Sequence, residues 1–266
     1  MVIGIDIGGT KILILRLIRN KIVGKRKYIL KKKNTEEIFN IIYSFSGDFK
    51  DKRIGISIPG MKINKDYFCL NLPRFSAYKL KKKLEKFGYK VKLENDANCF
   101  ALTNYYRHKI KNMVAITLGT GFGGGIIING KLYKGRNNAG EFGRIFLDDS
   151  KECEYFIGFM ELVRIYKEFS KKAMAPEKIF ELAKKGNKDA IRVFIKYGML
   201  VGIVISNLIY IFDPEAIVLG GGILKSKKFF KESMLKEIKR RVIFDIPKIL
   251  YGEYEDIALG ACYLFK

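Results

Sequence analysis

The sequence is short of the side chains on which many active sites depend. Its 266 residues include no Trp, four Cys and a single His, His108. A Ser-His-Asp triad would have to use His108, and a pair of histidines that bind a metal cannot be built. The cysteines form no Cys-x-x-Cys pair, which favours a reduced, cytoplasmic protein and makes a structural zinc site hard to build. Chemistry is left to carboxylates, lysines and backbone groups.

Long apolar runs are also missing. The longest, at residues 197–212, is shorter than the roughly 20 residues of a membrane span, and it includes Ser206 and Asn207. We interpret it as a buried core helix. The apolar start at residues 1–7 is interrupted by Asp6 and does not resemble a targeting segment. We therefore expect a soluble, cytoplasmic protein with no membrane partner.

Positive charge is in large excess. Lys and Arg number 51 against 27 Asp and Glu, which gives a formal net charge of +24. The lysines lie in short runs spread along the chain, for example at residues 31–33, 79–83 and 225–228. A nucleic-acid-binding surface would need a basic stripe with interleaved aromatics or a recognisable motif, so we expect no specific nucleic-acid partner. The charge would attract a polyanionic small substrate such as a nucleotide.

Strand and helix patterns alternate along the chain and indicate an α/β protein. The first thirty residues predict an antiparallel meander, and a second copy of that pattern starts near residue 113. The predicted strands are 2–7, 12–18, 22–30, 53–58, 90–93, 114–118, 125–128, 131–133, 216–219 and 248–251. The predicted helices are 35–44, 77–87, 97–106, 226–241 and 256–265, with further helices between 153 and 212.

Glycines cluster in three turns at strand ends. The turns read DIGGTK at residues 6–11, LGTGFGGG at 118–125 and GGG at 220–222. Glycine permits positive φ and lets a ligand approach main-chain N–H groups, as phosphate oxygens require. In the first turn Asp6 would hold Mg²⁺ through water. The candidate phosphate-binding residues, which bind ATP if the ligand is that nucleotide, are Asp6, Gly8, Gly9, Thr10, Lys11, Gly119, Thr120, Gly121, Gly123, Gly221 and Gly222.

Other readings of these turns are weaker. Gly119, Gly121 and Gly124 satisfy G-x-G-x-x-G, but a strand pattern rather than a helix follows them, so the dinucleotide fingerprint lacks its context. The G-x-x-x-x-G-K-[S/T] motif of P-loop proteins is missing from the sequence. An ordinary tight hairpin remains the alternative for any one turn taken alone.

Five segments, in order along the chain, resemble the ROK family of sugar kinases and sugar-responsive repressors. They are residues 6–11, 94–98, 118–125, 140–143 and 213–222. The resemblance implies an α/β, two-lobed actin-like (ribonuclease H-like) ATPase fold with nucleotide and sugar in a central cleft. The lobes would be residues 1–110 and 111–254, with a closing helix at 255–266 that packs back on the first lobe.

Phosphoryl transfer to a sugar hydroxyl needs an orienting base, a metal and donors for the transferring oxygens. We choose Asp96 as the base, because it follows a predicted strand and matches the family's aspartate. The alternative role for Asp96 is to cap the helix that follows, a role that Asn95 would fill equally well.

Sugar recognition needs side chains matched to a ring of hydroxyls. By resemblance, Asn95, Glu141 and Glu161 would fill this role. Glu161 aligns with the glutamate of the family's Gly-Cys-Leu-Glu, although a surface glutamate on a helix is the alternative. Asn71 is a weaker candidate, since an Asn close to Pro73 is often turn chemistry.

The sequence departs from the family at its structural zinc site. Arg144 stands at the histidine position, and Glu152, Glu154 and Phe159 stand where cysteines are expected. Cys153 is one position out of register. Zinc needs about four N or S ligands at defined spacing, so we predict no zinc. Arg144 would bind a substrate carboxylate or acetamido oxygen, or pair with a neighbouring glutamate.

Together these features predict an ATP- and Mg²⁺-dependent kinase whose partner is a small-molecule sugar. The acceptor would be a hydroxyl of glucose or of an N-acetylhexosamine such as N-acetylmannosamine. The alternative is a catalytically silent sugar-binding or regulatory ROK protein. Repression is disfavoured because only five residues precede Asp6, where a DNA-binding head would lie. The oligomeric state is left open, a homodimer included.

Overall fold

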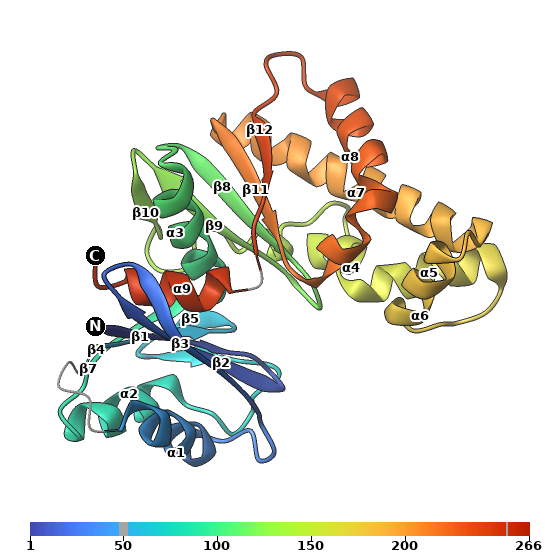
Figure 1. Cartoon of the computed structure of the whole chain (residues 1–266). Coiled ribbons are helices and arrows are strands. Elements are labelled where there is room, and N and C mark those ends of the chain that lie inside the picture. Colours follow the sequence, from blue (N-terminus) through green and yellow to red (C-terminus); the bar gives the residue numbers. More distant parts are fainter. Residues whose placement is uncertain (48–52, 254) are drawn as a thin grey trace.

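The protein folds into two lobes, each built around a five-stranded sheet (Figure 1). This computed structural model describes residues 1–47, 53–253 and 255–266. Both sheets place three sequence-adjacent antiparallel strands beside two parallel strands. The repeated topology inferred from the sequence is therefore present in the structure.

The first sheet has the spatial order β3-β2-β1-β4-β7. The strands β1, β2 and β3 form the antiparallel meander, and β4 and β7 extend the sheet in parallel to β1. The bounds are β1 (Val2–Ile7), β2 (Lys11–Ile18), β3 (Lys21–Ile29), β4 (Arg53–Ile58) and β7 (Lys90–Asn95).

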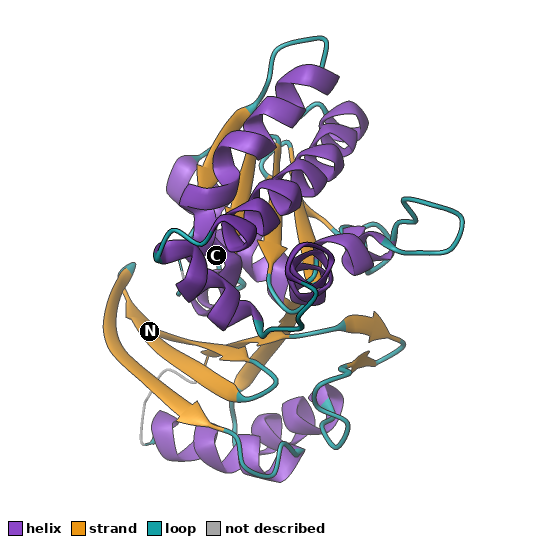
Figure 2. Cartoon of the chain, turned by 90° about the vertical axis from the view of Figure 1, so that its right-hand side faces the viewer, coloured by secondary structure: helices purple, strands orange, loops and turns teal. Residues whose placement is uncertain are grey.

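Two helices, α1 (Thr35–Ser46) and α2 (Ala77–Lys86), cover the outer face of this sheet (Figure 2). Each starts at a capping side chain that satisfies an N–H left open by the first turn. Asn34 Oδ1 accepts from Glu37 N at 2.9 Å, and Ser76 Oγ accepts from Lys79 N at 3.1 Å. Both helices thus begin where the sequence supplies a cap.

The second sheet has the order β10-β9-β8-β11-β12, which repeats the first. Its strands β8 and β9 are antiparallel, and β11 pairs in parallel with both β8 and β12. The bounds are β8 (Met113–Leu118), β9 (Phe122–Ile128), β10 (Lys131–Tyr133), β11 (Ala216–Gly220) and β12 (Lys248–Tyr251).

Two helices, α3 (Asp96–His108) and α9 (Asp256–Tyr263), lie against each other between the sheets (Figure 1). Each packs on the sheet of the opposite repeat: α3 on β8 and β9, and α9 on β1 and β4. The approach is close, because a Cβ at Gly55 would lie 1.8 Å from the carbonyl oxygen of Ala261. The lobe division near residue 110 stays a prediction, and residue 254 lies outside the described residues.

Helices α7 and α8 cover the face of the second sheet that is opposite α3, while α4 contacts β9 and α5 and α6 pack on α7 (Figure 1). Among the described residues, α7 is long and apolar enough to cross a membrane, yet 56% of its most apolar window is buried within the protein. This agrees with the core helix predicted at residues 197–212. The bounds are α4 (Cys153–Ile157), α5 (Phe159–Ser170), α6 (Pro176–Lys184), α7 (Lys188–Phe212) and α8 (Lys227–Arg241).

The structure corrects the sequence at the second glycine turn. The strand predicted at 125–128 begins at Phe122, so three glycines lie within β9 rather than in the turn. Close packing explains them: a Cβ at Gly124 would meet the Phe142 ring at 2.2 Å, and one at Gly125 would meet Ala97 O at 2.5 Å. The helix predicted at 226–241 is present as α8 from Lys227 to Arg241, and a short 3-10 helix, η2 (Gly222–Ser226), precedes it.

A small hairpin projects from the first lobe and was not anticipated. It consists of β5 (Met61–Ile63) and β6 (Asp66–Phe68), joined through Asn64, whose φ is +55°. The sequence signal was weak, because the turn has Asn64-Lys65 where an Asn-Gly or Asp-Gly pair would mark a hairpin. This hairpin forms one wall of the cavity described next.

Candidate functional site

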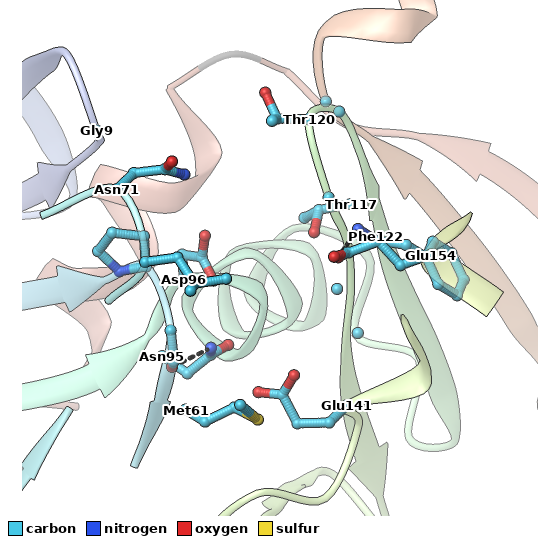
Figure 3. A pocket seen from close by; sticks show the side chains of 18 of the residues that line it. Gly9, Met61, Asn71, Asn95, Asp96, Thr117, Thr120, Phe122, Glu141 and Glu154 are labelled. Atoms are coloured by element: carbon cyan, nitrogen blue, oxygen red, sulfur yellow. Dashed lines mark hydrogen bonds between the residues drawn. The ribbon is translucent and has the colours of Figure 1, made fainter. Parts of the chain in front are cut away.

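A cavity of about 480 Å³ lies between the lobes, at the ends of β7, β8 and β11 (Figure 3). Residues of both lobes line it, and most of the site residues predicted from the sequence are among them. The predicted residues that line the cavity are Gly8, Gly9, Asn71, Asn95, Asp96, Gly119, Thr120, Gly121, Gly123, Glu141 and Gly221.

Asp96 and Asn95 stand where β7 ends and α3 begins, and the structure separates their roles. Asn95 is the helix cap: its Oδ1 accepts from Ala97 N at 2.8 Å and from Asn98 N at 3.2 Å, and its Nδ2 donates to Gly60 O at 3.1 Å. Asp96 Oδ1 accepts from Ala97 N at 2.9 Å. The second carboxylate oxygen of Asp96 remains available to a ligand in the cavity (Figure 3).

Burial raises the pKa of Asp96 to about 6, although the hydrogen bond from Ala97 N opposes the rise. A carboxylate in that range is still largely ionised at neutral pH and is a stronger base than an ordinary Asp. The site at the N-terminus of α3 thus holds a carboxylate with the protonation behaviour that a general base requires.

Asp6, at the end of β1, lies near enough to Asp96 for the two charges to interact. Burial and the negative charge of Asp96 raise the pKa of Asp6 to about 7. A hydrogen bond from Ser57 Oγ to Asp6 Oδ1, at 3.2 Å, and the charge of Lys11 oppose this rise. A divalent cation would stabilise the ionised form of Asp6, which burial and the neighbouring Asp96 charge disfavour.

Glu141 faces these carboxylates from the second lobe, with its side chain directed into the cavity (Figure 3). Burial and the charge of Asp96 raise its pKa, and Arg144 opposes that shift. The cavity therefore gathers hydrogen-bond acceptors from both lobes at one end, as recognition of several hydroxyls requires.

The second glycine turn is fixed by contacts with α4 and α5. Glu154 Oε2 accepts from Phe122 N at 3.0 Å, Phe159 N donates to Gly119 O at 3.2 Å, and Gly119 N donates to Gly121 O at 3.0 Å. A Cβ at Gly121 would lie 2.6 Å from Glu154 Oε2, so a side chain there would displace the carboxylate that holds Phe122 N.

The third turn needs glycine for its backbone conformation. Gly221 has φ of +96°, and a Cβ there would lie 2.0 Å from Leu118 O. Gly119 and Gly121 do not share that conformation. Among the candidate turn glycines, positive φ is therefore the reason at Gly221, and close approach is the reason at Gly9, where a Cβ would lie 2.8 Å from Asn71 Cβ. A Cβ at Gly119 would meet no atom within 4 Å, so neither reason applies there.

At the positions of the family's zinc ligands the chain has an ion-pair network. Arg144 Nη1 lies 2.6 Å from Glu152 Oε2, and Arg144 Nη2 lies 3.9 Å from Glu154 Oε1. Cys153 is buried and its N–H donates to Ile145 O at 2.6 Å. Arg144 thus pairs with neighbouring glutamates, one of the two roles foreseen for it, and it also lines the cavity.

Mg²⁺ and zinc prefer different ligands, and the side chains at this site can be compared with each preference. Mg²⁺ keeps several waters and binds through one or two carboxylates plus substrate phosphates, which fits Asp6 beside the glycine turns. Zinc requires a cluster of N or S ligands. The part of the chain that the structure describes has no group of three or more His, Cys, Asp or Glu suited to a metal ion. The absence of zinc stays a prediction.

Five predicted site residues do not line the cavity. They are Asp6, Thr10, Lys11, Glu161 and Gly222. The first three belong to or flank the first glycine turn, whose glycines do line it. Glu161 is different, because it is buried in α5 and its Oε2 accepts from Arg164 Nε at 2.6 Å. The structure does not bring its carboxylate to the other acceptors.

Sequence reasoning missed several lining residues. Met61, Phe68 and Leu70 come from the unanticipated hairpin and its exit, and Thr117 and Glu154 come from the second lobe. The hairpin residues carried no chemical signal, since apolar side chains in a short loop predict nothing about a ligand. Glu154 was noticed only as a replaced zinc ligand.

Comparisons with known proteins agree with this geometry. The model of the ROK family matches residues 2–255. An N-acetyl-D-glucosamine kinase of Vibrio cholerae is 30% identical over 306 residues, covering 99% of both chains. A ROK family glucokinase from Streptomyces griseus, solved with glucose and AMPPNP, is 27% identical with a TM-score of 0.84, covering 99% of this chain and 98% of its own.

The ROK hexokinase of Thermus thermophilus, at 24% identity, has a TM-score of 0.86 over 99% of this chain and 98% of its own, which concerns the fold alone. The two-lobed actin-like architecture expected from the sequence is confirmed. With the family model matching nearly the whole chain and a relative at 30% identity over its full length, this protein belongs to the ROK family.

Proposed function

We propose that this protein is an ATP- and Mg²⁺-dependent kinase that phosphorylates a hydroxyl of a hexose. One observation carries the proposal: glycine turns of both lobes and the carboxylates of Asp96 and Glu141 line a single cavity. The turns offer backbone donors to phosphate oxygens, and the carboxylates offer acceptors to sugar hydroxyls. Relatives over the full length are named as sugar kinases.

In the proposed reaction Asp96 is the base. A sugar hydroxyl held by Asn95 and Glu141 hydrogen-bonds to the free oxygen of Asp96, which orients its lone pair toward the γ-phosphorus. A bond forms between the hydroxyl oxygen and phosphorus, the bond to the bridging oxygen breaks, and ADP leaves with that electron pair. The hydroxyl proton passes to Asp96, whose raised pKa of about 6 suits it to receive the proton.

Backbone groups of the three turns would position the nucleotide. The proposed ATP contacts are those at Gly8 and Gly9, at residues 119–123 and at Gly221, with Thr10, Lys11 and Gly222 beside them. Asp6 would hold Mg²⁺ through water, and Mg²⁺ when bound neutralises charge on the transferring phosphates. A bound cation would favour the ionised form of Asp6 and so oppose the burial that raises its pKa.

The acceptor sugar is proposed as N-acetyl-D-glucosamine or glucose, with N-acetylmannosamine as a further N-acetylhexosamine. The Vibrio cholerae relative is named as an N-acetyl-D-glucosamine kinase, and the Streptomyces griseus glucokinase was solved with glucose. Arg144 lines the cavity with a guanidinium that could donate to an acetamido oxygen, and Met61 and Phe68 provide an apolar wall for a methyl group. The reaction would take place in the cytoplasm. Glu161 stays a prediction as a sugar contact.

The test is ADP release with ATP and Mg²⁺ across five sugars: glucose, mannose, fructose, N-acetylglucosamine and N-acetylmannosamine. We expect turnover with one or more of them, lost in Asp96→Asn. Silence on all five with sugar binding still detected by calorimetry would contradict the proposal and favour a catalytically silent binding protein.

A further inference from the structure

Asn71 occupies a position that its sequence context did not suggest. It lies in the segment that leaves β6, where buried Leu72 anchors the chain and Leu72 N donates to Cys69 O at 3.1 Å. The same segment places Asn71 directly on the first glycine turn. A Cβ at Gly9 would lie only 2.8 Å from Asn71 Cβ. Asn71 is therefore a neighbour of the phosphate turn rather than of the sugar acceptors around Glu141.

The amide of Asn71 is available to a ligand. Within residues 1–47, 53–253 and 255–266 the side chain of Asn71 makes no hydrogen bond, it is exposed, and it lines the cavity. Its amide end points across the cavity toward the lobe that carries Thr120 (Figure 3). Asn95 offers a contrast, because its amide already caps α3 and donates to Gly60 O. Both amide N–H donors of Asn71 are uncommitted, whereas Asn95 has one left for a sugar hydroxyl.

The charge of a ligand decides whether it would accept from the amide N–H groups of Asn71. The nearby carboxylates of Asp6 and Asp96 repel an anionic phosphoryl group, whereas an amide N–H attracts it without titrating. Thr120 on the opposite lobe lines the same cavity with a neutral hydroxyl. The two side chains thus flank the path between the glycine turns and Asp96.

We propose that Asn71 is a catalytic residue that donates a hydrogen bond to the transferring phosphoryl group and does not bind the sugar. This inference rests on the proposed function. In the transfer, the bond from phosphorus to the β-bridging oxygen breaks as the bond to the sugar oxygen forms, and the hydroxyl proton goes to Asp96. Asn71 neither gains nor loses a proton. It stabilises charge on an oxygen that both ATP and the transition state carry but ADP lacks.

The test compares a nucleotide that carries the γ-phosphoryl group, AMPPNP, with one that lacks it, ADP. Calorimetry measures the affinity of Mg²⁺-AMPPNP and of Mg²⁺-ADP for the unaltered chain, Asn71→Ala, Asn71→Asp and the control Asn137→Ala, an exposed Asn in a loop of the second lobe. We expect Asn71→Ala to weaken AMPPNP binding about fivefold to tenfold and to leave ADP binding within twofold. Asn71→Asp should weaken AMPPNP binding further, because a carboxylate repels the γ-phosphate. Asn137→Ala should resemble the unaltered chain.

Steady-state kinetics adds a second readout. We expect kcat to fall in both Asn71 variants and the KM for sugar to stay within twofold. A rise in sugar KM with AMPPNP affinity unchanged would overturn the inference and make Asn71 a sugar contact, and no change in any quantity would make it a turn residue only. If the unaltered chain binds AMPPNP but releases no ADP with any sugar, the proposed kinase function fails, and the AMPPNP to ADP comparison still decides the role of Asn71.

Discussion

The side-chain amide of Asn138 pairs with both backbone polar groups of Lys62, which lies in the opposite lobe. Lys62 N donates to Asn138 Oδ1 at 2.8 Å, and Asn138 Nδ2 donates to Lys62 O at 3.0 Å. A second bridge lies nearby, where Lys134 Nζ is 3.2 Å from Glu94 Oε2. The loop that leads to Glu141 is thus fastened to the hairpin and to β7 across the cleft.

Asn138→Ala should weaken this fastening. An exposed hydrogen bond contributes about 0.5–1 kcal/mol net, so the loss of two raises the KM for sugar by roughly fivefold to thirtyfold, because the lobes are held together less firmly. The value of kcat should change little, since Asn138 touches no reacting atom. The neighbouring Asn137→Ala is the matched control. A sugar KM that is equal in the two variants would contradict a role for this contact in cleft closure.

Asp96→Asn should abolish most turnover. The amide has the shape of the carboxylate and still accepts a hydrogen bond, but it cannot take the hydroxyl proton, so kcat is expected to fall about 10²-fold to 10⁴-fold. Sugar and AMPPNP affinities should change far less. Asp148→Asn, in an exposed loop, is the control that should keep full activity. Residual kcat above a tenth of the unaltered value would exclude Asp96 as the base.

The same substitution should stabilise the fold in a pH-dependent way. In the folded state the pKa of Asp96 is about 6, above the ordinary value of 3.8. Between these values the folded chain binds more protons than the unfolded chain, so stability falls as pH rises. Asn carries no such group. The stability difference between Asp96→Asn and the unaltered chain should therefore grow from pH 4 to pH 7, reaching roughly 1–3 kcal/mol.

Urea melts at several pH values measure this difference. Asp148 is the contrast, because hydrogen bonds from the N–H groups of Ser150 and Lys151 lower its pKa. Asp148→Asn should gain no stability as pH rises. A constant difference for Asp96→Asn across the range would show that the Asp96 carboxyl titrates normally in the folded chain.

The chain should need no zinc for its stability. Arg144 and Glu152 are about one-third exposed, and such pairs contribute about 0–1 kcal/mol, so we expect backbone contacts to provide most of the stability of this loop. Elemental analysis should find no stoichiometric zinc, and a chelator should leave the urea midpoint unchanged. One tightly held zinc per chain would show that ligands exist beyond those expected from the sequence.

The repeated fold was predictable because its signals are local. Alternating apolar residues and tight turns mark β1 to β3 and again β8 to β10, and the structure has these strands near the expected bounds. Asn95 was also a foreseeable cap, because the side-chain oxygen of an Asn directly before a helix commonly accepts hydrogen bonds from the first N–H groups of that helix.

What could not be predicted depends on contacts far apart in sequence. The crossed packing of α3 and α9 follows from the absence of side chains at Gly55 and Gly260, which are far from the residues they approach. The same holds for Asn71, which comes next to Gly9 only when the segment after β6 packs against the first glycine turn. A motif names the residues of a site, but the fold decides which of them face one another.

The glutamates of the site provide a last comparison. Glu141 faces the cavity, whereas Glu161 is buried and its carboxylate is bound to Arg164. Loss of a charged acceptor for a sugar hydroxyl costs about 1.5–3 kcal/mol, so Glu141→Gln should raise the KM for sugar roughly tenfold to a hundredfold. Glu161→Gln should raise it less and lower the urea midpoint instead, because it breaks a partly buried ion pair. Equal effects on sugar KM would mean that the Glu161 carboxylate leaves Arg164 and reaches the sugar when the cleft is occupied.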